Sequence, residues 1–334
     1  MRFYSHRGLT LLVRLIFALA LAACTAAPAT TPEPSQRNHA DGSRTTADAL
    51  DAVALTAGEQ LQVAATTSII GDVVAQIGGQ HISVTTIMMP GVDPHSYTPT
   101  PQDLRTLSAV DVIFINGLHL EEGLDSLLSQ AGAPRISVNE HVSLLSRAAE
   151  PADDDHGAED PHTWQSVQNV ITWVATIKTA LSALDPAHAA DYQAAAATYQ
   201  GELTALDGEI RTKIATIPPA NRKLVTDHDT FRYFAHDYGF TIVGTVLGSL
   251  STLAEPSAQE LAALQDQIVA EQVPALFVGT TVNPDLAEQL ANDLTIKVVA
   301  LYSDALSADD GPAATYLAFM RYNVDAIVTA LGVQ

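Results

Sequence analysis

The sequence predicts an α/β protein of two lobes, each with a four-stranded parallel sheet and surrounding helices, joined by one long rigid helix. Short apolar runs alternate with helical segments, a pattern typical of parallel sheets built from βα units. The runs number four in each half of the chain, and a long helical segment separates the halves. We therefore expect a first lobe at residues 59–187, a linker helix at 188–217 and a second lobe at 218–334.

The eight expected strands are short runs rich in β-branched and other apolar residues. In the first half they are Leu61–Thr67, Ile82–Ile87, Asp111–Asn116 and Arg135–Asn139, and in the second half Lys223–Thr226, Thr241–Thr245, Ala275–Gly279 and Lys297–Leu301.

The linker helix is predicted from an apolar stripe whose members alternate between spacings of three and four residues. Asp185-Pro186 marks its start and Pro218-Pro219 its end. At 1.5 Å per residue, a helix of roughly 29 residues spans about 43 Å, the length of a whole lobe. Such a connector would limit hinging, although the periodicity equally allows a surface helix packed on one lobe. The stripe consists of Tyr192, Ala196, Tyr199, Leu203, Leu206, Ile210 and Ile214.

Residues 1–24 have the features of a lipoprotein signal peptide. Three arginines precede an apolar run at residues 15–20, which is too short to span a membrane comfortably. The run ends in Leu21-Ala22-Ala23-Cys24, which resembles a bacterial lipobox. Cys24 is the only cysteine, so the chain has no disulfide framework. We expect Cys24 to be lipidated and to anchor the protein to a membrane; the alternative is an ordinary signal peptide with an incidental cysteine.

Residues 25–58 are expected to form a flexible tether, because they are rich in Ala, Thr, Pro, Ser and Asp and lack apolar periodicity. The whole chain carries a net charge of −22. Such a surface disfavours nucleic acid as a partner and attracts cations at long range. A solvated acidic coat explains the charge equally well, so charge alone does not indicate a metal site.

The tripeptide Asp-Pro-His occurs twice, as Asp93-Pro94-His95 and Asp160-Pro161-His162. Chance predicts far less than one copy, so the repetition suggests selection. Proline fixes its own φ and biases the preceding residue toward an extended conformation, so each imidazole leaves a stiff turn in one direction. Histidines presented in this way suit a preformed metal site, because neutral imidazole is a common zinc ligand.

Two further ligand candidates follow expected strands of the second half. His228 comes after the run that ends at Thr226, and Asp304 comes after the last expected strand. His95 similarly lies beyond the second expected strand, and His162 precedes the helix that begins near Trp164. Ligand sites gather beyond the carboxyl ends of strands in open α/β sheets, so these four side chains are candidates for one site.

Six motifs in order make the chain resemble the solute-binding component of an ABC importer for zinc or manganese, the cluster that includes metal-binding lipoproteins. They are Gly91-Val92-Asp93-Pro94-His95-Ser96-Tyr97, Asn116-Gly117-Leu118-His119-Leu120-Glu121, Asp160-Pro161-His162-Thr163-Trp164, His228-Asp229-Thr230-Phe231-Arg232-Tyr233-Phe234, Glu255-Pro256-Ser257 and Tyr302-Ser303-Asp304-Ala305-Leu306. The resemblance runs from about residue 60 to the C-terminus. It implies two lobes joined by a rigid helix, with the metal held in the cleft by His95, His162, His228 and Asp304. It also implies an ABC permease and its ATPase as partners.

The resemblance bears on the choice of metal, because this family has either histidine or glutamate at the position of His228. Three histidines and one carboxylate suit a tetrahedral site and favour Zn²⁺. Mn²⁺ prefers more oxygen donors, although an Asp304 bound through both oxygens would still admit it. Residues 153–159 resemble a shortened form of the acidic, His-rich loop of zinc receptors, in which His156 would collect metal. A solvated acidic turn with an incidental histidine is the alternative.

One segment departs from the family pattern. Trp164-Gln165-Ser166-Val167 follows the second ligand, where much of the family has an acidic or amide residue and then proline. A ligating imidazole needs its other ring nitrogen held by a carboxylate, carbonyl or water, so the departure leaves open what supports His162. Among the other histidines, His119 is expected to pack or to support a ligand. Surface positions are expected for His81, His141, His188 and His236.

These expectations combine into a monomeric, membrane-anchored receptor in the periplasm or at the cell surface that delivers Zn²⁺ to an ABC permease and is not an enzyme. Four protein ligands close the coordination sphere, whereas a catalytic zinc keeps a position for water. A zinc hydrolase is less consistent with the chain, because the sequence contains no His-Glu-x-x-His. The sequence also allows a manganese receptor of the same family, a zinc chaperone without a transporter, and an adhesin that binds no metal.

Overall fold

The computed structural model of the protein describes residues 45–146 and 159–332. The predicted signal peptide with Cys24, most of the predicted tether and His156 lie outside the described residues. Within those residues, no helix has both the length and the apolar character needed to cross a bilayer.

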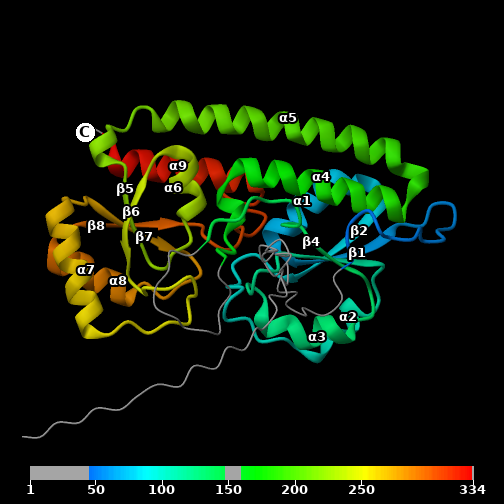
Figure 1. The fold of residues 1–334 in the computed structure, drawn as a ribbon, viewed down its shortest axis with the longest axis horizontal. Coiled ribbons are helices and arrows are strands. Elements are labelled where there is room, and N and C mark those ends of the chain that lie inside the picture. Colours follow the sequence, from blue (N-terminus) through cyan, green and yellow to red (C-terminus); the bar gives the residue numbers. More distant parts are fainter. Residues whose placement is uncertain (1–44, 147–158, 333–334) are drawn as a thin grey trace, which may run out of the picture. The chain divides into compact units, whose positions relative to one another are not determined.

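Two four-stranded sheets form the framework, and all their strands are parallel (Figure 1). The strand order is β2-β1-β3-β4 in the first sheet and β6-β5-β7-β8 in the second, so the two lobes repeat one topology. The strands of the first sheet are β1 (Leu61–Thr67), β2 (Ile82–Met88), β3 (Val112–Ile115) and β4 (Arg135–Ser137). Those of the second are β5 (Lys223–Thr226), β6 (Thr241–Thr245), β7 (Ala275–Gly279) and β8 (Lys297–Leu301).

The inner strands are apolar because helices cover both faces of a parallel sheet. All residues of β3 and β7 are buried. The covering helices of the first lobe are α1 (Ser68–Gly78), α2 (Pro101–Leu107), α3 (Asp125–Gln130) and α4 (Val167–Leu184). Those of the second are α6 (Arg232–Tyr238), α7 (Ala258–Glu271), α8 (Asp285–Leu294) and α9 (Tyr316–Leu331). Side-chain caps define several starts; in α7, Ser257 and Glu260 form a capping box.

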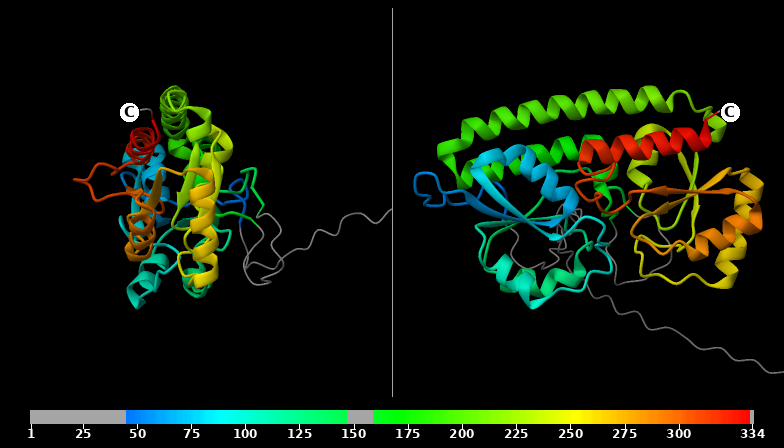
Figure 2. Two further views of the ribbon diagram at one scale, coloured as in Figure 1. Left: turned by 90° about the vertical axis from the view of Figure 1, so that its left-hand side faces the viewer. Right: turned by 180° about the vertical axis from the view of Figure 1, so that it is seen from behind.

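The long helix α5 (Ala189–Ile214) packs on both lobes. It begins after a 3-10 turn at Pro186–His188, and its buried residues are the seven of the predicted stripe. It contacts α1 and α4 of the first lobe and α9 of the second, and it runs over both sheets (Figures 1 and 2). One buried apolar cluster continues from Val63 in β1 through Leu203 in α5 to Phe277 in β7. The alternative of a helix packed on one lobe alone is therefore wrong.

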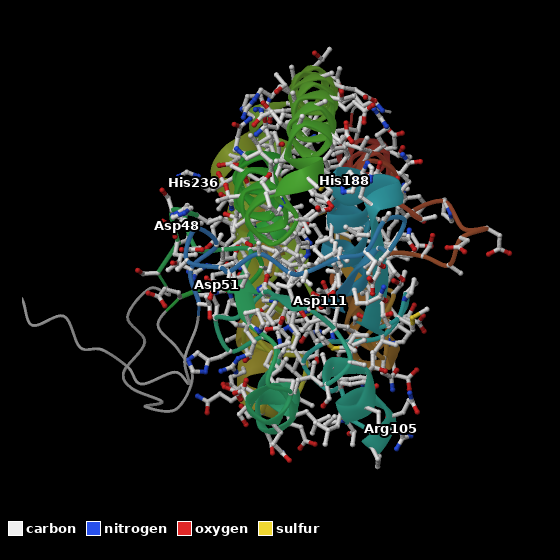
Figure 3. The ribbon with its side chains drawn as sticks, turned by 90° about the vertical axis from the view of Figure 1, so that its right-hand side faces the viewer. Asp48, Asp51, Arg105, Asp111, His188 and His236 are labelled. Atoms are coloured by element: carbon white, nitrogen blue, oxygen red, sulfur yellow. The ribbon has the colours of Figure 1, made fainter. Side chains whose placement is uncertain are left out.

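The last part of the predicted tether differs from expectation, because residues 45–58 lie against the first lobe. Ala47 is buried in the main core, and the Val53 backbone N–H donates to Leu184 O at 2.8 Å. Asp48 and Asp51 are exposed on the outside of this segment (Figure 3). Only a few apolar residues hold this segment in place. Its composition is otherwise that of a flexible linker, so composition alone did not predict that it packs on the lobe.

Candidate metal centre

The four predicted ligands come together although they are distant in sequence. His95 follows β2, His162 immediately precedes the 3-10 turn Thr163–Gln165, His228 follows β5, and Asp304 follows β8. One ligand atom from each side chain lies within 4.8 Å of all the others. Among the described residues this is the only group of histidine, cysteine or acidic side chains with such spacing. The structure thus places two donors from each lobe around one point.

The imidazoles converge through their Nε2 atoms. The Nε2 atoms of His95 and His162 are 3.1 Å apart, and His228 Nε2 lies 3.4 Å from Asp304 Oδ1. His162 and His228 have no exposed surface and Asp304 has 1%, whereas His95 is partly exposed. A group inside this cluster would therefore be shielded from water on three sides and would meet solvent past His95.

The two Asp-Pro-His copies form the same local turn. Asp93 Oδ1 accepts the backbone N–H of His95, and Asp160 Oδ1 accepts that of His162, both at 2.9 Å. In the second copy Asp160 Oδ1 also lies 2.8 Å from His162 Nδ1. The carboxylate therefore holds the proton on Nδ1 and leaves the Nε2 lone pair facing the other donors.

His228 is oriented in the same way by its neighbour in sequence. Asp227 Oδ1 lies 2.8 Å from His228 Nδ1, and Asp227 Oδ2 accepts the backbone N–H of Gly279 at 2.6 Å. A side chain at Gly279 would crowd that carboxylate, since an added Cβ would lie 3.0 Å from Asp227 Oδ2 and 2.3 Å from Ser303 Oγ. Sequence reasoning missed Asp227, although an aspartate beside a candidate ligand was a signal for it.

The two oxygens of Asp304 have different surroundings. Its Oδ2 accepts hydrogen bonds from the hydroxyls of Ser303 and Thr281. Its Oδ1 is buried without a hydrogen-bond partner among the described residues, as is His228 Nε2. Buried polar atoms normally have partners, so two such atoms facing each other indicate a place for a bound group.

The segment that departs from the family pattern has a structural use. Trp164 Nε1 and Gln165 Nε2 both donate to Ser303 O, at 2.7 and 2.9 Å, and so fix the backbone next to Asp304 from the other lobe. Ser166 caps α4 by accepting the backbone N–H of Asn169. Support for His162 comes instead from Asp160, which belongs to the motif itself.

Burial and mutual charge set the proton affinities of the cluster. Burial, helped by the neighbouring His162, lowers the pKa of His95 to about 3, so this ring is neutral in the neutral range. Burial also works against a charged His228, but Asp304 and Asp227 outweigh it and raise the pKa of His228 well above its usual value. The pKa of Asp304 is lowered although burial opposes ionisation, because His228 and the other imidazoles favour the carboxylate.

The remaining described histidines lie outside this centre. His119 is exposed, and its Nδ1 lies 3.0 Å from Glu122 Oε1, so it neither packs nor touches a ligand. His236 is exposed beside Asp237 (Figure 3). His188 stacks on His81 with ring centroids 3.9 Å apart. His141 is exposed. Stacked rings direct their nitrogens along parallel planes, so the His81–His188 pair does not converge on a point.

Comparison with known proteins gives one family. The family model described as zinc-uptake complex component A, periplasmic, matches residues 63–330. The manganese-binding lipoprotein MntA of Bacillus subtilis is 35% identical over 288 residues, which cover 84% of this chain and 93% of the relative. The manganese ABC transporter substrate-binding lipoprotein PsaA of Streptococcus anginosus is 29% identical over 285 residues, covering 83% and 91%.

Solved structures give the same result. The periplasmic zinc-binding protein TroA of Treponema pallidum superposes with a TM-score of 0.76 at 30% identity, over 82% of this chain and 100% of that one. The Mn-bound periplasmic metal-binding protein of Candidatus Liberibacter asiaticus superposes with a TM-score of 0.73 at 30% identity, over 81% and 100%.

Proposed function

Because the chain belongs to the family of the periplasmic component A of zinc-uptake complexes, we propose that it captures one divalent metal ion outside the cytoplasm and delivers it to an ABC permease and its ATPase. Relatives named as ABC transporter substrate-binding lipoproteins support this assignment. They are named as binding components and not as enzymes. Binding by a monomer and membrane attachment through a lipidated Cys24 are parts of the same proposal.

The observation that carries the proposal is the convergence of His95, His162, His228 and Asp304 within 4.8 Å. We propose that these four side chains are the metal ligands. Four protein donors complete a tetrahedral sphere, so no position remains for the water that a hydrolytic zinc needs. Since each lobe supplies two donors, the bound ion would also link the lobes.

We propose Zn²⁺ as the cargo. Three imidazole nitrogens and one carboxylate oxygen are a donor set typical of four-coordinate zinc. The two hydroxyls on Asp304 Oδ2 favour binding through Oδ1 alone, whereas Mn²⁺ seeks more oxygen donors. The relatives are named for manganese or zinc, so the donor set, and not the names, carries the choice.

The test is direct competition between Zn²⁺ and Mn²⁺, measured by isothermal titration calorimetry on the wild type and on variants of His228. His228→Ala leaves three donors, so Zn²⁺ affinity should fall sharply, and His228→Glu should shift preference toward Mn²⁺. The exposed His236→Ala is the matched control and should bind like the wild type. A wild type that prefers Mn²⁺ would refute zinc selectivity, and one that binds neither ion would refute the function.

A further inference from the structure

A segment of the second lobe connects the backbone around His228 to the turn that carries His95. This segment, residues 246–253, leaves β6 and precedes α7. We refer to it as the strap, because hydrogen bonds fix it on both lobes.

One end of the strap is fixed on the His228 segment. The backbone N–H of Leu247 donates to Asp227 O at 2.7 Å, and the backbone N–H of Asp229 donates to Ser249 O at 2.8 Å. These two bonds lie on either side of His228 in sequence. The position of the strap is therefore tied to the position of this histidine.

Within the described residues, the other end of the strap is hydrogen-bonded to the first lobe through the side chain of Thr252. Thr252 Oγ1 donates to Asp93 Oδ2 at 2.7 Å, and Asp93 Oδ1 accepts the backbone N–H of His95 at 2.9 Å. One carboxylate thus holds both the His95 turn and the strap. The hydroxyl of Ser96 also donates to Asp93 Oδ2, at 2.9 Å, but it belongs to the same turn and to the same lobe.

The His95 turn is the part of the centre through which an ion would leave. His95 is the one partly exposed member of the four, while the other three are buried. The same loop also contacts the second lobe through the backbone N–H of Gly91, which donates to Leu306 O at 3.1 Å. Displacement of the turn therefore requires both hydrogen bonds to loosen. The bond from Thr252 is made by a side chain, so a substitution can remove it.

We propose that Thr252 is a positioning residue for metal retention: its hydroxyl latches the His95 turn to the strap and slows release of the bound ion. This inference rests on the proposed function. In this proposal the strap links His95 of the first lobe to His228 of the second. A partner that displaces the strap would thereby loosen His95 and open the exit.

The test compares zinc dissociation from three variants of the full-length protein, each loaded with Zn²⁺ and mixed with excess chelator in a stopped-flow instrument. Thr252→Val keeps the shape and removes the donor, and we expect dissociation to become roughly tenfold faster, since a hydrogen bond to a charged group is lost. Zinc association should change much less. Thr252→Ser restores a hydroxyl and should restore slow release.

Ser251→Ala is the matched control, because it removes a neighbouring hydroxyl of the strap whose bond, from the backbone N–H of Leu253 at 3.2 Å, stays within one lobe. It should release zinc at close to the wild-type rate, and all variants should melt near the wild-type temperature in the metal-free form. Unchanged release from Thr252→Val, or equally fast release from Ser251→Ala, would overturn the latch. A wild type that retains no Zn²⁺ would instead defeat the proposed function, and the latch with it.

Discussion

At the scale of single residues, the candidate centre depends on how its imidazoles are aimed. Asp160 holds Nδ1 of His162, and Asp227 holds Nδ1 of His228, each at 2.8 Å. Both rings therefore present Nε2 to the shared point before any ion arrives. Such preorganisation reduces the cost of ordering ligands on binding.

Removal of the Asp160 carboxylate should weaken metal binding. We expect Asp160→Ala to lower Zn²⁺ affinity by about 10- to 100-fold, because the imidazole loses the partner that fixes its tautomer and direction. Asp160→Asn keeps an acceptor and should lie between this variant and the wild type. Chelator competition measures both affinities, and equal affinity of Asp160→Ala and wild type would show that the carboxylate does not orient the ring.

Zinc binding should release a proton from His228. Asp304 and Asp227 raise the pKa of His228 against the opposing effect of burial, which favours the protonated ring when no metal is bound. His95 has a pKa of about 3 and is already neutral, so it has no proton to release. Affinity should therefore fall as pH falls, and binding should release a proton.

Calorimetry in buffers of different ionisation enthalpy counts the released protons. His228→Ala should abolish the release together with most of the affinity. Zinc binding by the wild type with a pH-independent constant between pH 6 and 8 would contradict this assignment of the proton.

The ligand candidates were predictable from sequence because each lies beside a recognisable local signal. Most of the residues that hydrogen-bond to the ligands or to their backbone were not predictable. The tripeptide pointed to His95 and His162, and strand ends together with the family resemblance pointed to His228 and Asp304. Thr281 reaches Asp304 from the segment after β7, and Trp164 reaches Ser303 O from 139 residues away. Contacts of this kind depend on tertiary packing, which sequence periodicity does not encode.

At the scale of elements, sequence pattern was most informative where burial is periodic. The stripe on α5 predicted the same seven residues that the structure buries. The end of β4 was less accessible to prediction: the strand stops at Ser137, and the Asn139 side chain accepts from Thr163 Oγ1 and Trp173 Nε1. The sequence predicted that the strand would continue to Asn139, because nothing in the local pattern shows that this side chain bonds residues of other segments.

The two exposed glycines inside α5 give a test of its role as a stable connector. Neither Gly201 nor Gly208 has a neighbour within 4 Å of an added Cβ, and neither has a positive φ. Gly201→Ala and Gly208→Ala should each stabilise the protein by about 0.5–1 kcal/mol, because alanine loses less backbone entropy in a helix. Urea unfolding measures the change, and a loss of stability in both variants would contradict a regular helix at these positions.

At the scale of the whole molecule, the described residues form two lobes of one topology, which share core packing through α5 and are also joined by polar contacts. Besides the centre, Asp72 of α1 accepts the backbone N–H of Tyr316, and Ser68 accepts that of Leu306. These contacts limit how far the lobes separate. Metal capture and release would then involve small displacements of ligand-bearing loops more than wide opening.

The membrane anchor remains a prediction, because Cys24 lies outside the described residues. We expect the mature protein to begin at an acylated Cys24 and to be recovered in the membrane fraction. Cys24→Ser should move the protein to the soluble fraction while leaving zinc affinity unchanged, because Cys24 is not one of the four proposed ligands. A mature N-terminus at another residue, read by intact-mass spectrometry, would exclude this anchor.

The central claim is tested most directly by a crystal structure of the zinc-loaded protein, with the ion located by anomalous scattering at the zinc edge. We predict a single ion bound by Nε2 of His95, His162 and His228 and by Oδ1 of Asp304, at distances of about 2.0–2.2 Å. An ion bound at another place, or donors from only one lobe around it, would contradict the account.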